Sequence, residues 1–350
     1  MVCFSPEPNG DSKCGVVPAK FKPRLVIIGP LPPPRGGVSV HVERLLHWLC
    51  HAGRAFGFVN TKTLMLKDLI KAARFADVAH VHISNSLRRM GVLVILRIFG
   101  VCPIITIHGD VGRHGRFRNF VETLTFRLAH AVITLNAHSF AAVGVLHSNV
   151  YRMSAFLPPA GNGELSGKAA AVLRDARNNV EILFVTNCSS LDYHSNGKEI
   201  YGIRSLLGFF EKIPRWGLVV LDSTSRYRMF SGLTEEMIPT NVWFLENGED
   251  FVPVVGAADA YIRCTQTDGD SLSIWEALVQ GKAVFASNVV DRPDGVITFD
   301  CNDLQTLYLA IEAWVENPHQ VVESALMDDP KKIAGRAIDR LEKIYSSAVS

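Results

Sequence analysis

The stretch Asp259–Val290, DAYIRCTQTDGDSLSIWEALVQGKAVFASNVV, shows the plan on which the chain is built. Its pattern predicts a strand, a polar loop, a helix and a second strand, over Ala260–Ile262, Thr265–Asp270, Ser271–Gln280 and Ala283–Ala286. Gly281 would end the helix, because glycine adopts a left-handed conformation at little cost. Strand, loop, helix and strand in this order form the repeating unit of an open α/β sheet.

The loop of this unit is a candidate anion site. It would lie between the C-terminal end of a strand and the N-terminus of a helix, where open α/β sheets bind ligands and where backbone N–H groups favour a phosphate. The carboxylates of Asp268 and Glu276 lie on either side of the turn. An interpretation without a ligand is also open: Asp270 can cap the helix, and Ser273 with Glu276 fits a capping box.

Length and composition indicate an ordinary globular protein of two domains. The chain has 350 residues, of which 48% are hydrophobic and 20% charged. Its seven cysteines are scattered without a Cys-x-x-Cys pair, so neither a disulfide framework nor a zinc site is expected. The first 20 residues lack the apolar segment of a signal peptide and predict a loose tail. The longest apolar run, Gly91–Ile105, is too short to span a bilayer.

Charge is distributed unevenly along the chain. Residues 1–160 hold 19 Lys and Arg against 7 Asp and Glu, whereas the remainder holds 17 against 27. A basic half favours contact with phosphates or with an acidic membrane surface. Such asymmetry between domains also serves solubility alone, and this alternative stays open.

The N-terminal half begins with a strand–loop–helix unit, predicted over Arg24–Gly29, Pro30–Gly37 and Val38–Leu49. Gly36 and Gly37 would let the backbone turn and let a ligand approach closely. The loop is neither a GxGxxG fingerprint nor a P-loop. His41, one turn into the helix, is interpreted as a packing or surface residue.

Two further histidines come at predicted strand ends. His82 shares a face with His80 on the strand Val78–Ile83, and His108 follows the strand Ile104–Ile107. A His-x-His pair can bind zinc, but no third ligand is evident nearby in the sequence, so no metal is predicted. Both His82 and His108 are well placed to line a cleft.

Two basic segments follow these strands. The helix Ser86–Phe99 is either largely buried or rests on anionic lipid through its arginines. The segment Arg113–Arg118, with Arg113 and Arg116, is predicted as a loop before the helix Phe120–Ala129. It is either a solvated loop or an arm over an anionic acceptor.

Phe156–Gly167, FLPPAGNGELSG, predicts a linker. Lys198 would stand at the start of a helix over Ile200–Phe210, where a lysine opposes the helix dipole unless an anion is bound. The expected organisation is a flexible tail, an N-terminal domain, a linker, a C-terminal domain and a returning C-terminal helix, over residues 1–22, 23–157, 158–167, 168–318 and 319–350.

The ordered motifs resemble the family 4 glycosyltransferases. They are Gly36-Gly37-x-x-x-His41, Asp77-x-x-His80-x-His82, His108-Gly109, Ala258-Asp259-Ala260 and Asp268-x7-Glu276 with Gly281-Lys282-Ala283-Val284. The resemblance covers residues 24–320, and the PPPRGGVSVH version is similar to members that build bacterial surface polysaccharides. It implies a GT-B fold: two Rossmann-like, doubly wound α/β domains facing across a cleft, with C-terminal helices packing back across them. It also implies a retaining, nucleotide-sugar-dependent enzyme that acts by front-face attack.

The resemblance assigns roles to individual residues. Glu276 would hold the ribose hydroxyls, and Asp268 would contact the donor sugar where the family usually has a glutamate. Donor binding would further involve Gly36, Gly37, Lys198, Gly269, Asp270, Ser271 and Leu272. His108 would lie beside the sugar, and His82, Arg113 and Arg116 would meet the acceptor. The family also supplies an arginine after the first strand of the second domain, but residues 186–197 contain none.

The sequence thus predicts a cytoplasmic glycosyltransferase, at most peripheral on the inner membrane's cytoplasmic face. Its partners would be a nucleotide-diphosphate sugar, a lipid-linked or saccharide acceptor and an anionic membrane, with no nucleic acid, metal or cofactor. A nucleotide-sugar epimerase of GT-B architecture and a non-catalytic nucleotide-sugar-binding partner are the alternatives.

Overall fold

The computed structural model describes residues 2–5, 13–14, 23–33, 35–112, 115–161, 163–194, 196–318 and 329–349. The chain divides into two compact units. Unit 1 comprises residues 1–160 and 329–350, and unit 2 comprises residues 161–328. The break after residue 160 falls within the Pro- and Gly-rich stretch at which the sequence predicts a linker.

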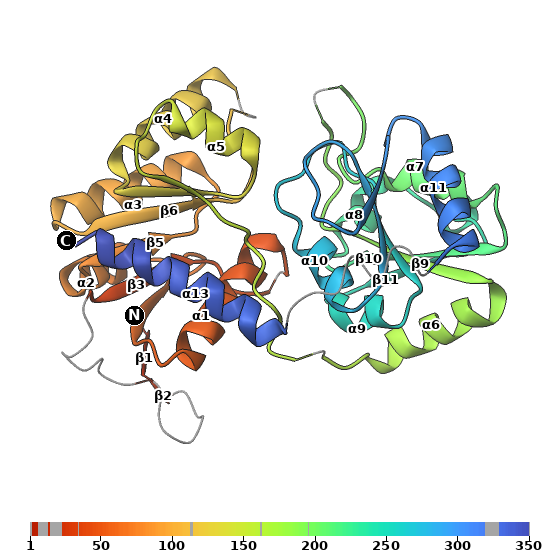
Figure 1. The fold of residues 1–350 in the computed structure, drawn as a ribbon, viewed down its shortest axis with the longest axis horizontal. Coiled ribbons are helices and arrows are strands. Elements are labelled where there is room, and N and C mark those ends of the chain that lie inside the picture. Colours follow the sequence, from red (N-terminus) through yellow and green to blue (C-terminus); the bar gives the residue numbers. More distant parts are fainter. Residues whose placement is uncertain are drawn as a thin grey trace. The chain divides into compact units, whose positions relative to one another are not determined.

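Unit 1 is built on a sheet with the strand order β2-β1-β4-β3-β5-β6-β7-β8 (Figure 1). The strands are β1 Val2–Ser5, β2 Lys13–Cys14, β3 Leu25–Gly29, β4 Phe56–Asn60, β5 Val78–Val81, β6 Cys102–Ile107, β7 Ala131–Thr134 and β8 Val150–Arg152. From β4 to β8 all neighbours pair in parallel. β1 adds to the β4 edge in antiparallel fashion, so part of the predicted loose tail is a strand.

Helices cover both faces of this sheet because successive residues of a buried strand point to opposite sides. Leu25 and Ile27 of β3 pack with α1 and α13, whereas Val26 and Ile28 pack with helices on the other face. The helices are α1 Gly37–His51, α2 Leu66–Phe75, α3 Ser86–Ile98, α4 Arg116–Leu128, α5 Ala137–Gly144 and α13 Pro330–Ser347.

The C-terminal helix α13 belongs to unit 1 although it follows unit 2 in the chain (Figure 1). Its buried residues Ile338, Leu341 and Ile344 recur at helical spacing and join the core formed by α1, β3 and β4. The hydroxyl of Tyr345 lies 2.7 Å from Nδ1 of His80, which fixes the last turn of α13 to β5.

Unit 2 has an all-parallel sheet in the order β11-β10-β9-β12-β13-β14. Its strands are β9 Ile182–Cys188, β10 Trp216–Asp222, β11 Val242–Glu246, β12 Ala260–Arg263, β13 Ala283–Ser287 and β14 Val296–Phe299. Its helices are α6 Gly167–Asn179, α7 Ile203–Phe210, α8 Arg226–Ser231, α9 Phe251–Gly256, α10 Leu272–Val279 and α11 Leu304–Glu316, with a 3-10 turn at Glu235–Met237.

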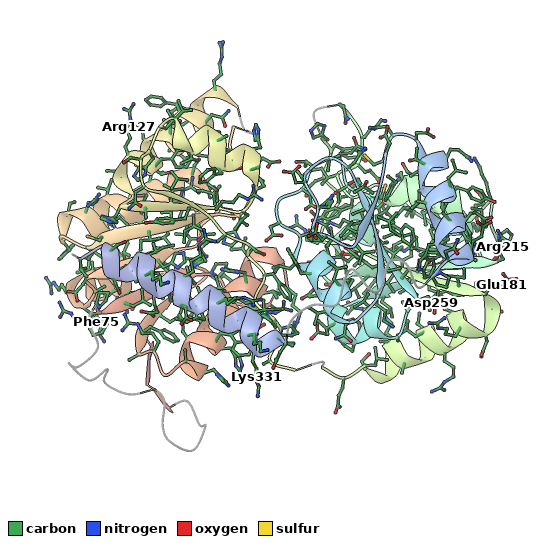
Figure 2. The ribbon with its side chains drawn as sticks, in the orientation of Figure 1. Phe75, Arg127, Glu181, Arg215, Asp259 and Lys331 are labelled. Carbon is green, nitrogen blue, oxygen red and sulfur yellow. The ribbon has the colours of Figure 1, made fainter. Side chains whose placement is uncertain are left out.

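Two layers of helices enclose this second sheet. Residues of α7, α8 and α11 share one core with one face of the strands, and residues of α6, α9 and α10 share the other. Asp259, labelled in Figure 2, precedes β12 and accepts hydrogen bonds from both terminal nitrogens of Arg177 at 2.5 and 2.8 Å, which ties α6 to the sheet.

Each sheet has a switch point, which is the place where the strand order reverses. In unit 2 the first strand, β9, lies beside the fourth, β12; in unit 1 β3 lies beside β5. Doubly wound sheets bind ligands at such points, outside the carboxyl ends of the strands. The residues that follow β9 and β12 in unit 2, and β3, β5 and β6 in unit 1, are therefore the places to examine for a site.

Candidate functional site

The loop after β12 is organised around Asp268. One carboxylate oxygen accepts from Arg263 at 3.0 Å and from the Gly269 backbone N–H at 3.1 Å. The other accepts from Arg263 at 3.0 Å and from Arg292 at 2.8 Å. A carboxylate has about four lone-pair sites in all, so these four bonds use its acceptor capacity. Asp268 therefore holds the loop, and the sugar contact implied by the resemblance would require one of these bonds to break.

Asp268, Arg263 and Arg292 form a buried cluster with one surplus positive charge. Their side chains are 7%, 11% and 3% exposed. Burial by itself would raise the pKa of Asp268, but the guanidinium groups of Arg263 and Arg292 hold it below its usual value. Burial likewise opposes the charge of Arg263, and the Asp268 carboxylate keeps its pKa well above the ordinary range. These pKa shifts keep Asp268 and Arg263 in their charged forms.

Hydrogen bonds between side chains fix the start of α10 to the ends of β9 and β12. The Tyr261 hydroxyl donates to Asn187 Oδ1 at 2.6 Å and lies 2.7 Å from Ser273 Oγ. Ser273 Oγ lies 2.9 Å from Ser271 Oγ. Asn187 also accepts from Arg263 at 3.4 Å. These bonds thus fix the first turn of α10 beside the switch point of the sheet.

Capping of α10 differs from the prediction. The N-cap is Ser271 and not Asp270, whose Oδ1 accepts from the Trp275 indole at 2.5 Å instead. The predicted Ser273–Glu276 capping box does not form, because Ser273 lies inside the helix and bonds to Tyr261. Glu276 is buried, at 6% exposed, within the second turn of α10. Gly269 lies in the loop before the N-cap, and Leu272 is the first residue of α10.

Lys198 does not start a helix. α7 begins at Ile203, and the segment before it turns through a bridge between Tyr193 and Glu199. The Lys198 ammonium donates to Asn302 Oδ1 at 2.6 Å. Gln266, in the loop after β12, accepts a bond from Asn196 at 3.1 Å, and its backbone N–H bonds to the Ile200 carbonyl at 2.9 Å. The structure therefore places the Lys198 segment against the same loop, by contacts the sequence does not show.

The switch point of unit 1 contains the glycine pair. Gly36 is the N-cap of α1, with an extended φ of −159°, and a Cβ added at Gly36 or Gly37 would meet no atom within 4 Å. The conformation of Gly36 and the space around both residues therefore do not require glycine at these positions. A Cβ at Gly29, in contrast, would lie 2.8 Å from Val42 and 3.2 Å from His82 Cβ, so close packing of β3 against α1 requires that glycine.

Three histidines gather at the same switch point. His41 of α1, His82 after β5 and His108 after β6 each offer one ring nitrogen, and these atoms lie within 4.8 Å of one another. His82 Nδ1 is 3.0 Å from His108 Nε2. The sequence placed each of these two histidines at a strand end, and the structure brings the two side chains together. α1 brings His41 to His82 and His108, a neighbour that is not evident in the sequence, whereas His80 of the His-x-His pair is not a member of this group.

Burial keeps these imidazoles neutral. It lowers the pKa of His41 to about 4, opposed by the hydrogen bond to Ala155 and assisted by the charge of Arg44. Burial also lowers the pKa of His82 and of His108 well below the ordinary value, and the neighbouring histidines lower both further. Neutral imidazoles can accept a hydrogen bond or bind a metal, which a charged imidazolium cannot.

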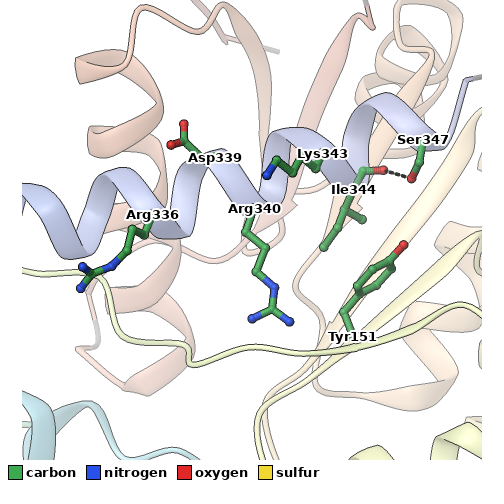
Figure 3. A pocket seen from close by; sticks show the side chains of 7 residues that line it. All are labelled: Tyr151, Arg336, Asp339, Arg340, Lys343, Ile344 and Ser347. Atoms are coloured by element: carbon green, nitrogen blue, oxygen red, sulfur yellow. Dashed lines mark hydrogen bonds between the residues drawn. The ribbon is translucent and has the colours of Figure 1, made fainter.

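Neither arginine that was predicted to meet the acceptor is identified by the structure as a member of this cluster. Arg113 falls outside the described residues. Arg116 is not in a loop: it is exposed in the first turn of α4, four residues before the predicted helix start. A hollow of about 590 Å³ lies elsewhere on unit 1, between α13 and β8 (Figure 3). Its lining includes Tyr151, Arg336, Arg340 and Lys343, and none of the predicted site residues.

Comparison with solved structures identifies the fold. The chain aligns with sucrose-phosphate synthase from Thermosynechococcus elongatus at a TM-score of 0.67 and 16% identity, over 93% of this chain and 100% of that one. It aligns equally with Anabaena HepE in complex with UDP, at 0.67 and 14% over 93% and 100%, and with WaaG, a glycosyltransferase of lipopolysaccharide biosynthesis, at 0.61 and 15% over 90% and 98%. The chain has the GT-B glycosyltransferase fold. No family model and no curated protein matches its sequence.

The GT-B chain carries two site residues that the sequence interpretation missed. Arg263 ends the otherwise apolar strand β12, and a charged residue at the carboxyl end of a buried strand was a usable signal. Arg292 follows β13 and lies 24 residues beyond Asp268, with no local pattern to connect them. The segment after the first strand of unit 2 carries no arginine, whereas Arg263 and Arg292 come from two other strand ends.

Proposed function

We propose that the protein is a retaining glycosyltransferase that moves a sugar from a nucleotide-diphosphate sugar to a lipid-linked saccharide, as a family 4 member in surface polysaccharide synthesis. Among the structural neighbours, Anabaena HepE is in complex with UDP or UDP-glucose, and the catalytic domain of starch synthase IV from Arabidopsis thaliana is bound to ADP and acarbose. A sugar nucleotide is accordingly the ligand class that we assign to unit 2.

The observation that carries the proposal is the Arg263–Asp268–Arg292 cluster at the switch point of unit 2. Glycosyl transfer from such a donor releases a nucleoside diphosphate, so negative charge develops on the leaving group. Fixed positive charge beside the loop, together with the N-terminus of α10, stabilises that charge without reorganisation. Asp268 positions the two guanidinium groups, and the backbone N–H groups at the start of α10 are the further donors that we propose.

Glu276 is the proposed ribose ligand. A carboxylate accepts two hydrogen bonds from a vicinal diol, which matches the 2′ and 3′ hydroxyls of a ribose. Its position on α10 lies within two turns of the loop that we assign to the diphosphate. Lys198, held against the same loop through Asn302, is the proposed further cation for the donor.

Unit 1 is proposed to present the acceptor side of the reaction. His82 and His108 are neutral and 3.0 Å apart, and His108 is partly exposed, so it can bond a sugar hydroxyl. Gly36 and Gly37 leave open space that a side chain would fill, which suits close approach of a ligand to the backbone. Retention of anomeric configuration, by front-face attack, is part of the proposal and follows from the family resemblance.

The acceptor is proposed to be reached at the cytoplasmic face of a membrane. Exposed apolar residues lie on three helices of unit 1: Ile98 of α3, Phe117 and Phe120 of α4, and Val145 beside α5, between 61% and 87% exposed. Arginines such as Arg97, Arg116 and Arg118 accompany them, a combination that favours anionic lipid. No helix among the described residues is long and apolar enough to span a membrane.

A donor-turnover assay tests the proposal. The protein is incubated with a panel of nucleotide sugars, with and without lipid-linked saccharides, and released nucleoside diphosphate is measured by chromatography. One donor is expected to be turned over, at a rate reduced at least about 100-fold in Glu276→Gln because a ribose ligand is lost. Glu316→Gln, which changes an exposed glutamate of α11, is the matched control.

The product distinguishes the alternatives. A glycoside with the anomeric configuration of the donor supports the proposal. Conversion of a nucleotide sugar to an isomer of equal mass would instead identify an epimerase, and binding with no release of diphosphate would identify a non-catalytic partner.

A further inference from the structure

We propose that His41, His82 and His108 form a binding site for a divalent transition-metal ion of the zinc class. The inference does not depend on glycosyl transfer, since it concerns three side chains of unit 1 and is tested by metal binding alone.

The three imidazoles lie close to the separation that a single ion requires. Their ring centroids lie 5.1 Å apart for His41 and His82, 5.1 Å for His41 and His108, and 5.3 Å for His82 and His108. The candidate ligand nitrogens lie within 4.8 Å of one another. Nitrogens bound to one tetrahedral zinc at about 2.0–2.1 Å lie roughly 3.4 Å apart, so small side-chain rotations bring the three into range.

His41 is held in the tautomer that a metal needs. Its Nδ1 lies 2.6 Å from the carbonyl oxygen of Ala155, which can only accept. Nδ1 therefore carries the proton, and Nε2 offers its lone pair. A ligating histidine that donates its other N–H to a backbone carbonyl is the usual outer-shell arrangement of protein metal sites.

His82 provides the second, independent observation. Its Nε2 is buried and has no hydrogen-bond partner among the described residues. Neighbouring His80 shows the contrast: its Nδ1 lies 2.7 Å from the Tyr345 hydroxyl and its Nε2 2.7 Å from the Thr106 hydroxyl. Buried polar atoms without partners are rare and costly, and they mark places where a ligand or ion belongs.

The site would leave a coordination position open. Three protein ligands on zinc leave a fourth position for water or a substrate atom, whereas closed structural sites use four protein ligands. His108 is partly exposed, so this side of the cluster is accessible. Imidazole nitrogens favour zinc, cobalt, nickel and copper over calcium or magnesium, which prefer oxygen ligands.

Metal binding is measured on the full-length protein after treatment with a chelator. Cobalt(II) is titrated and its visible d–d absorption recorded, and zinc(II) is then added in competition. We expect one equivalent of cobalt with the absorption of a four- or five-coordinate ion, displaced by zinc. His41→Gln, His82→Gln and His108→Gln are each expected to weaken binding by at least about tenfold.

His47→Gln is the matched control, because His47 lies on the exposed face of the same helix α1, with its ring 6.4 Å from that of His51. Binding should be unchanged in this variant. Absence of a saturable one-to-one cobalt complex in the wild type would overturn the proposal. Loss of binding in His47→Gln with retention in the cluster variants would do the same, since the metal would then sit on the helix surface.

Folding of each variant is checked by circular dichroism. If a buried variant does not fold, partly exposed His108 and the wild-type stoichiometry decide the outcome. The absorption measurement needs no donor or acceptor, so metal binding and glycosyl transfer can fail separately.

Discussion

Asp268 is the residue whose role the structure changes most. Where the resemblance implies a glutamate in contact with the donor sugar, this chain has a side chain one methylene shorter, and its carboxylate bonds to Arg263, Arg292 and the loop backbone. The resulting cluster supplies the positive charge that the segment after β9 lacks. In the proposed function Asp268 is therefore a positioning residue, and Glu276 is the carboxylate assigned to the nucleotide.

Asp268→Asn is expected to destabilise unit 2 by about 3–5 kcal/mol at pH 7, because two buried guanidinium groups lose their counter-charge. The pKa of Asp268 is lowered in the folded state, so its contribution is present above the unfolded pKa of about 4 and is lost as the pH falls through the folded value. The difference in unfolding free energy between wild type and variant should shrink below about pH 4.

Urea unfolding followed by tryptophan fluorescence measures this difference, since four of the five tryptophans lie in unit 2. Asp291→Asn, a change of a nearby carboxylate outside the cluster, is the control. Equal stability of the Asp268→Asn variant at pH 7 would show that the cluster is not the anchor of the loop.

At this scale, the sequence predicts part of the candidate site. Asp268 and Glu276 were identified from their positions around one loop, because the strand–loop–helix pattern is local. Arg292 and His41 were not, since each reaches its partners through contacts between elements distant in sequence. The charge state of Asp268 depends on those contacts and is therefore not visible in the sequence.

At the scale of elements, the β3–α1 connection separates packing from ligand contact. Gly29 has no room for a Cβ, whereas Gly37 has. Gly37→Ala is therefore expected to change the unfolding free energy by no more than about 1 kcal/mol. If the donor approaches this backbone, the added methyl group should weaken donor binding by about tenfold or more, which corresponds to about 1.4 kcal/mol.

Gly29→Ala gives the opposite pattern and serves as the comparison. Its Cβ would lie 2.8 Å from Val42 Cγ2, and overpacking of this kind costs about 1–3 kcal/mol. Thermal unfolding and calorimetric titration with the donor measure both quantities. Donor affinity in Gly37→Ala equal to that of the wild type would remove this loop from the proposed site.

Most elements could be predicted because buried strands and amphipathic helices have clear periods. The prediction was wrong where polar residues start a helix. α4 begins at Arg116. The predicted start was four residues too late because the first turn, Arg116, Phe117 and Arg118, is exposed and carries no apolar stripe. α7 begins at Ile203, after Gly202 with a φ of +59°. The predicted start at Ile200 was too early because the sequence does not distinguish the turn before Gly202 from the start of a helix.

For the whole molecule, the two-sheet GT-B architecture follows from the alternation of strands and helices on either side of a Pro- and Gly-rich stretch. The strand order could not be predicted from this alternation, because it depends on which strands pair with each other in the sheet. Once that order is known, both switch points coincide with the candidate residues: the arginine cluster in unit 2 and the histidine cluster in unit 1.

The two units are expected to lose stability in different pH ranges. The pKa of His41 is about 4 in the folded state against an ordinary value of 6.5. The unfolded chain therefore binds the proton first, and stability falls as the pH falls from 6.5 to about 4, by about 3 kcal/mol for His41 alone. Protonation of Asp268 lowers the stability of unit 2 only below about pH 4. As the pH falls, unit 1 should therefore lose stability before unit 2.

Hydrogen exchange with mass spectrometry at pH 7 and pH 5 follows the two units separately. After correction for the intrinsic exchange rate, β3, β5 and β6 should lose protection at pH 5 while β9 and β12 keep it. Equal loss in both units would contradict the assignment of this sensitivity to the buried histidines.

The most direct test of the central claim is calorimetric titration of the protein with the common nucleoside diphosphates of adenine, guanine, uracil, cytosine and thymine. We predict that at least one binds with a stoichiometry of one, and that Glu276→Gln weakens its binding by about tenfold or more whereas Glu316→Gln does not. Absence of binding for all five, or an unchanged affinity in Glu276→Gln, would contradict the assignment of unit 2 to a nucleotide-sugar donor.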